Sequence, residues 1–199
     1  MTALVLGLAL FIGMHSVRIV APGLRDAAIA RLGEGPWKGA YAVVSLVGLV
    51  LVGRGWGEAS RELLYAPLPG ARTVLLVAML PLLVLLIAGN LPAGRIRRWA
   101  RHPMMIAALG WSALHLAVNG HAAGIALFGG LAAWSAVEVA SLFSRERAAA
   151  LGPHGAAPPA PAKPLPWWPD IVAVAAGLGA YAWLVGGGHV SLFGVSPIG

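Results

Sequence analysis

The stretch RHPMMIAALGWSALHLAVNG, residues 101–120, decides how this chain folds. It begins beside a cluster of arginines, runs apolar for about four helical turns, and ends at Asn-Gly. Trp111, His115 and Asn119 recur at every fourth position, so a helix places them on one face. Because burying an unpaired polar group costs roughly 2–7 kcal/mol, this polar stripe needs partners from other segments.

The composition predicts a membrane protein. Of the 199 residues, 59% are hydrophobic and only 11% are charged, whereas soluble domains carry about 25% charged residues. The net charge of +7 comes from basic residues in short segments between apolar runs, a pattern that fits membrane topology and anionic lipid better than nucleic acid. Without cysteines, disulfides, thiolate zinc sites and cysteine nucleophiles are excluded.

We expect an all-α, polytopic integral membrane protein with six spans in a single domain, residues 1–199. Each span approaches the ~20 residues that a bilayer core requires. The first apolar run lacks the features of a cleaved signal peptide, so we expect it to remain a span. Within the domain we expect a core over residues 1–152 and a proline-rich linker over 153–169, re-anchored at the interface by Trp167 and Trp168. The expected spans are 2–21, 39–56, 72–91, 103–119, 122–143 and 170–188.

The distribution of Lys and Arg predicts the orientation. The first, third and fifth connections carry eleven of the fourteen basic residues, and the second carries Arg54, Arg61 and Arg72. Cytoplasmic connections are enriched in Lys and Arg. We therefore expect the strongly basic face to be cytoplasmic and both termini to lie in the periplasm, across a bacterial inner membrane.

Ionisable residues within the apolar spans are candidates for function. Glu138 and His102 each lie eighteen residues from Gly120, so a hairpin with ~1.5 Å rise per residue places them at one level. We therefore expect Glu138 to pair with His102 or Arg101 near the cytoplasmic face. The pair is either a structural ion pair or a contact to a substrate or cofactor.

His15 and His115 are the other histidines in the spans. Each is either a satisfied core residue or an axial ligand of a haem or metal, since imidazole is a common donor. Their expected depths differ, at ~20 Å and ~7 Å from the outer surface, so depth alone favours His15 with His102. Three further histidines in connections are expected to be solvated: His121, His154 and His189.

Four segments together resemble the NnrU family of bacterial membrane proteins, over most of the chain up to about Gly152. The family name implies an association with denitrification and nitrogen-oxide respiration. The segments are GMHSVR at 13–18, GEGPWKGAY at 33–41, RHP at 101–103 and WSALHLAVNG at 111–120.

Two relatives of this family suggest chemistry. The plant 15-cis-zeta-carotene isomerase, a haem b protein, has histidine motifs similar to those around His15 and His115. This resemblance implies that His15 and His115 are metal ligands, in the axial positions of a haem iron. A cysteine of that enzyme corresponds to Ser112, so exchange to a thiolate ligand is impossible here. Our first hypothesis is that His15 and His115 bind haem b, and His102 is the rival ligand.

The second relative is the isoprenylcysteine carboxyl methyltransferase group, whose Arg-His-Pro motif binds S-adenosylmethionine. That motif resembles Arg101-His102-Pro103, with Glu138 as a possible further contact, but Met105 replaces the expected aromatic residue. The third hypothesis is a non-enzymatic assembly factor in which the polar stripe only packs helices. Whether the protein is an enzyme stays open between these hypotheses.

Overall fold

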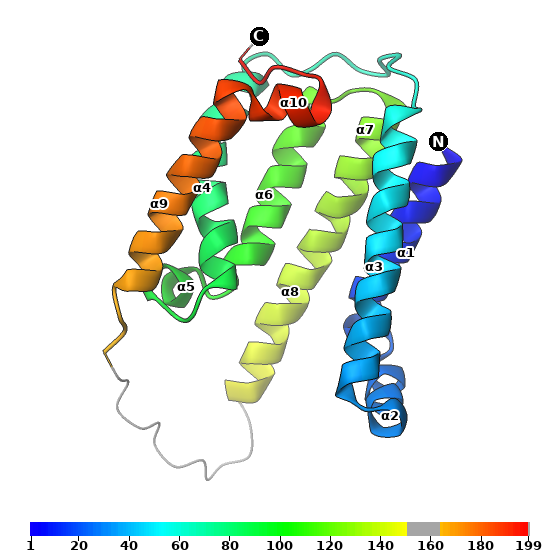
Figure 1. The fold of residues 1–199 in the computed structure, drawn as a ribbon, viewed down its shortest axis with the longest axis vertical. Helices are drawn as coiled ribbons and strands as arrows, with labels where there is room; N and C mark the ends of the chain where they lie inside the picture. Colours follow the sequence, from blue (N-terminus) through cyan, green and yellow to red (C-terminus); the bar gives the residue numbers. More distant parts are fainter. Residues whose placement is uncertain (151–163, 199) are drawn as a thin grey trace.

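The computed structural model describes residues 1–150 and 164–198, and in these ranges the chain is helical apart from its connections (Figure 1). A single antiparallel β-bridge joins Leu63 to His121 in the described part. The elements are α1 (Thr2–Val20), α2 (Pro22–Leu32), α3 (Glu34–Gly57), α4 (Ala71–Asn90), α5 (Arg95–Ala100), α6 (Pro103–Val118), α7 (Ala122–Gly124), η1 (Ile125–Gly129), α8 (Gly130–Ala150), α9 (Trp168–Trp183), η2 (Leu184–Gly188) and α10 (His189–Phe193).

Five helical segments of the described chain are long and apolar enough to cross a membrane. They are Thr2–Val20, Glu34–Gly57, Ala71–Asn90, Ala122–Ala150 and Trp168–Phe193. The expected fourth span is the shorter α6, with 16 residues, and it runs between the end that holds α5 and the end that holds α7 (Figure 1). The all-α, polytopic membrane fold is therefore confirmed.

Proline and glycine set several helix boundaries. Pro22, Pro103 and Pro169 occupy the first turns of α2, α6 and α9, where the missing N–H costs nothing. Gly33 separates α2 from α3 with φ 87°, a conformation that glycine adopts without steric cost. Helix α9 begins at Trp168, so the expected linker ends earlier than Pro169, and its residues 153–163, which include His154, lie outside the described ranges.

The helices form two packed groups. Helix α1 packs along α3, and α4 packs against α6 and α9, while α8 contacts both α6 and α1. Figure 1 shows α8 slanting between the two groups. The α1–α3 contact is close because Gly7 and Gly48 face each other: a Cβ on Gly7 would come within 2.6 Å of the Gly48 carbonyl oxygen. This contact brings α1 and α3 together around His15.

The two ends of the molecule differ in charge. Helices α2 and α5 lie at one end, and both termini lie at the other (Figure 1). The described basic residues of the first, third and fifth connections between spans lie at the α2–α5 end (Figure 1). Both termini lie at the opposite end, as an even number of membrane crossings requires. Asp170 at the start of α9 accepts hydrogen bonds from the backbone N–H groups of Arg95 and Ile96, at 2.9 and 3.0 Å. The last span is thereby attached to the basic end, where Arg95 also stacks on Trp167 at 3.1 Å.

Candidate functional site

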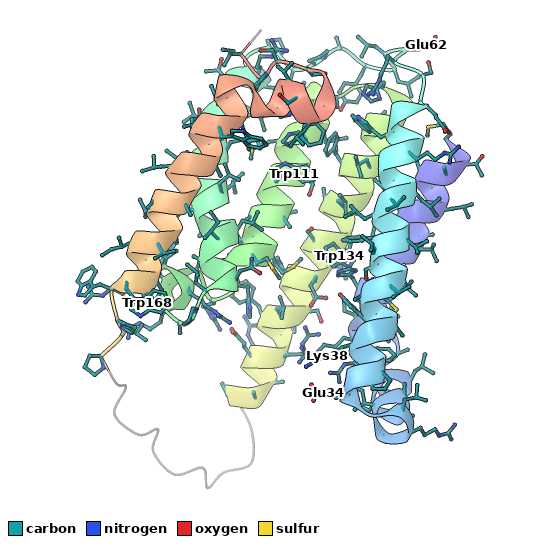
Figure 2. The ribbon with its side chains drawn as sticks, in the orientation of Figure 1. Glu34, Lys38, Glu62, Trp111, Trp134 and Trp168 are labelled. Carbon is teal, nitrogen blue, oxygen red and sulfur yellow. The ribbon has the colours of Figure 1, made fainter. Side chains whose placement is uncertain are left out.

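His15 lies where α1, α3 and α8 meet, in a group that we call the His15 cluster: Phe11, His15, Tyr41, Trp134 and Glu138. The imidazole stacks on Phe11 with ring centroids 4.2 Å apart and contacts Tyr41 at 5.0 Å and Trp134 at 5.7 Å. Figure 2 shows Trp134 between α8 and the α1–α3 pair. Aromatic rings from three helices therefore hold the imidazole in place.

Several polar atoms of this junction are buried without a partner among the described residues: Ser45 Oγ, Trp134 Nε1 and Glu138 Oε2. The other Glu138 oxygen accepts from Arg145 at 3.1 Å, and Arg145 also donates to Ser141 at 2.6 Å. Because buried polar atoms in native proteins are nearly always satisfied, each orphaned atom calls for a partner such as water or a ligand. The His15 cluster therefore has unused capacity to bind a polar group.

His115 lies in a second group, the His115 cluster, made of Trp56, Trp111, His115, His121 and Phe128. Phe128 contacts His115 at 5.0 Å, Trp111 at 5.2 Å and Trp56 at 5.5 Å. Phe128 belongs to η1, a π-helical segment, and such bulges inside α-helices are frequent at functional sites. The bulge places the Phe128 ring at the centre of this cluster.

The two histidines share one hydrogen-bond arrangement. Nδ1 of His15 lies 2.7 Å from the Phe11 carbonyl oxygen, and Nδ1 of His115 lies 2.8 Å from that of Trp111. A carbonyl oxygen only accepts, so Nδ1 must carry the proton and donate it. The lone pair then resides on Nε2, as in a histidine that binds a metal while its other nitrogen is held by a backbone carbonyl.

The structure does not bring the predicted ligands into one group. His15 contacts Trp134 and His115 contacts Phe128, and these two aromatic residues are six positions, or ~9 Å, apart along one helix. Within residues 1–150 and 164–198, no three His, Asp or Glu side chains are grouped as a metal site. Whether the two histidines are ligands therefore stays a prediction.

The prediction that Glu138 pairs with His102 or Arg101 is wrong. Glu146 makes these contacts instead: Arg101 donates to it, and Nε2 of His102 lies 2.9 Å from its Oε1. The depth argument used only the number of residues from the turn, and Glu138 instead pairs with Arg145 of its own helix at 3.1 Å. Glu146 lies two turns further on and points toward the start of α6. Arg101 adopts φ 61° there, a strained value for a residue other than glycine.

His121 was expected to be solvated, and the structure corrects this. It is buried with 6% exposure, and its Nδ1 accepts from the Gly124 N–H at 3.0 Å, capping α7. Nη1 of Arg61 lies 3.3 Å from its Nε2, and the Trp56 ring lies 5.0 Å away. Burial, followed by the nearby Arg61 charge, lowers the pKa of His121, so the neutral imidazole is favoured.

Sequence reasoning missed four members of these clusters, Phe11, Tyr41, Trp56 and Phe128, and also missed Arg61 beside His121. Tyr41 lies in the GEGPWKGAY segment that carried the family resemblance, so it was within reach. The π-helical turn at Phe128 and the folding of the 58–70 connection over the end of α6 left no periodic signal. That connection bonds to Gly120 through the N–H groups of Leu64 and Tyr65.

These features define a polytopic helical membrane protein with two histidine–aromatic clusters, one at an α1–α3–α8 junction and one around a π-helical turn. A family model described as NnrU protein matches residues 3–197, nearly the whole chain. The chain belongs to the NnrU family. No curated protein and no solved structure matches it.

Proposed function

We propose that this protein is a haem-binding, redox-linked protein of the bacterial inner membrane that supports nitrogen-oxide respiration, with His15 and His115 as axial ligands of haem b. One observation carries the proposal. Both imidazoles donate Nδ1–H to a backbone carbonyl one turn earlier, which leaves each Nε2 lone pair available to iron. No described residue hydrogen-bonds either Nε2 atom.

The surroundings of the two imidazoles are mainly apolar, and the pocket beside His15, at about 170 Å³, is smaller than a whole haem requires. Both clusters are built mainly of aromatic side chains, and burial in an apolar shell is one of the levers by which proteins set the potential of haem. When bound, haem supplies one-electron transfer. The nitrogen-oxide role comes from membership of the NnrU family, and the basic α2–α5 face is assigned to the cytoplasm by the positive-inside rule.

The contacts constrain how haem can be held. His15 and His115 share no aromatic neighbour in the described residues. A single iron held by both would require α1 and α6 to approach each other, whereas separate haems would require the aromatic rings of each cluster to move apart around its imidazole. His102 stays the rival ligand: its Nε2 lies 2.9 Å from Glu146 Oε1, yet it is buried without a hydrogen bond among the described residues.

An optical spectrum tests the proposal. Protein expressed with ample haem and extracted in detergent is expected to show a Soret band that weakens in His15→Ala and His115→Ala. His189→Ala is the matched control, because this imidazole bonds to Val195 near the C-terminus and belongs to neither cluster. Absence of a Soret band in the parent protein would remove the proposal.

A second candidate function, S-adenosylmethionine binding at Arg101-His102-Pro103, is favoured by the strained backbone of Arg101. Non-glycine residues with positive φ cost roughly 1–3 kcal/mol and cluster at functional sites. Titration calorimetry with S-adenosylmethionine tests this alternative. Binding heat that disappears in Arg101→Ala and persists in Arg98→Ala would support a methyltransferase-like enzyme, and no heat in the parent protein would reject it.

A further inference from the structure

A pocket opens at the basic end of the α1–α3 pair. Its volume is about 170 Å³, and its lining consists of Met14, His15, Val17, Arg18, Arg25, Trp37 and Tyr41. Pockets that enclose a whole small molecule measure about 300–1,000 Å³. This pocket therefore fits a compact head group better than a complete cofactor.

The lining is cationic. Two guanidinium groups face the pocket and no carboxylate lines it. Arg25 pairs with Asp26 at 3.0 Å, but both side chains are exposed, and such surface pairs contribute little. For Arg18, no ion pair is found within the described residues. The planar guanidinium fork matches a phosphate group, to which it can donate two parallel hydrogen bonds.

The position of the pocket is that of a membrane interface. Arg18 lies in the last turn of α1, and Trp37 lies in the first turn of α3. Helix α2 joins these ends and has no buried residue, and it lies at the same end of the molecule as α5 (Figure 1). Trp and basic residues are enriched where the bilayer meets water.

We propose that this pocket binds the phosphate of an anionic phospholipid from the leaflet on the basic face. The phosphate sits between Arg18 and Arg25, the Trp37 and Tyr41 rings flank the glycerol region, and the acyl chains stay in the bilayer. Inorganic phosphate shares the same chemistry, but only a lipid uses the flanking aromatic rings and the bilayer beside them. The pocket shares His15 and Tyr41 with the His15 cluster, but the binding of a phosphate rests on Arg18 and Arg25 and does not require haem.

Native mass spectrometry of the delipidated full chain tests the proposal, with phosphatidylglycerol and phosphatidylcholine added separately. We expect tighter binding of the anionic lipid and a loss of about thirtyfold in Arg18→Gln/Arg25→Gln, since each arginine near anionic lipid contributes roughly a fivefold factor. Arg18→Lys/Arg25→Lys keeps the charge and is expected to keep the preference. The matched control is Arg31→Gln/Arg72→Gln, which removes the same charge away from the pocket.

Three results would overturn the proposal. The first is equal binding of the two lipids, and the second is equal loss of binding in the pocket and control variants. The third is saturation of the pocket by inorganic phosphate at millimolar concentration with no preference for lipid, which would assign the site to a soluble anion. Circular dichroism of each variant shows whether the helices are retained, and the lysine variant tests the site if the glutamine variant does not fold.

Discussion

The Nδ1 atom of His115 lies 2.8 Å from the carbonyl oxygen of Trp111, one helical turn earlier. This hydrogen bond fixes both the ring orientation and the tautomer, because the carbonyl can only accept. The same relationship at His15 has its acceptor on Phe11. Two histidines in different helices thus present the same nitrogen for binding, and this shared arrangement connects the fold to the proposed cofactor.

Helix α1 is held against α3 by glycines, and enlarging one of them should destabilise this helix pair. A methyl group on Gly55 would overlap the backbone of Leu4. Gly55→Ala is therefore expected to lower the stability by about 1–3 kcal/mol, the usual cost of overpacking, as measured by thermal unfolding in detergent. Gly53→Ala lies on the same helix with open space around it and should not be destabilising; equal losses would contradict the packing account.

Glu138 is expected to contribute to stability through Arg145. The carboxylate is 13% exposed, whereas the Arg145 side chain is 36% exposed and keeps its hydrogen bond to Ser141 when Glu138 is removed. We expect Glu138→Ala to cost about 1 kcal/mol, because a charge-assisted hydrogen bond of a mostly buried carboxylate is lost while the remaining guanidinium is partly hydrated. The control is Glu58→Ala, which breaks the exposed pair with Arg54 and should cost at most about 0.5 kcal/mol. A Glu138 variant as stable as the control would show that the pair is not held in the interior.

His121 predicts a dependence of stability on pH. Burial and the neighbouring Arg61 lower its pKa in the fold, so the unfolded chain binds a proton first as pH falls. The stabilisation of the fold by the neutral His121 side chain is fully present above about pH 6.5, the ordinary pKa of histidine. It is lost as the pH falls toward the lower pKa of His121 in the folded protein. His121→Asn keeps a capping side chain and cannot titrate. Between about pH 7.5 and 5.5, a range that brackets this pKa, the unfolding temperature should fall less in the variant than in the parent protein. Identical pH profiles of the two proteins would exclude His121 as the source.

Much of the fold could be predicted from the sequence. Long apolar runs set the spans, since a bilayer core imposes both length and composition. Pro103 and Asn119-Gly120 marked the fourth span within a residue of α6.

The partners of the polar residues could not be predicted in the same way. Equal residue counts from a turn do not determine which partner a side chain meets: Glu138 pairs with Arg145, and Glu146 meets Arg101 and His102. His121 looked solvated because it lies in a short connection. Its burial depends on Arg61, sixty residues earlier in the chain, and such long-range contacts leave no local pattern.

The most direct test of the central claim is the amount of haem bound per polypeptide, measured as the pyridine haemochrome in purified protein. The parent protein is expected to carry haem, each of His15→Ala and His115→Ala to carry less, and the double variant to carry none. Singles that each retain about half would indicate separate haems, and singles that lose nearly all would indicate one shared iron. A double variant with the full haem content of the parent, or a parent without haem, would contradict the account.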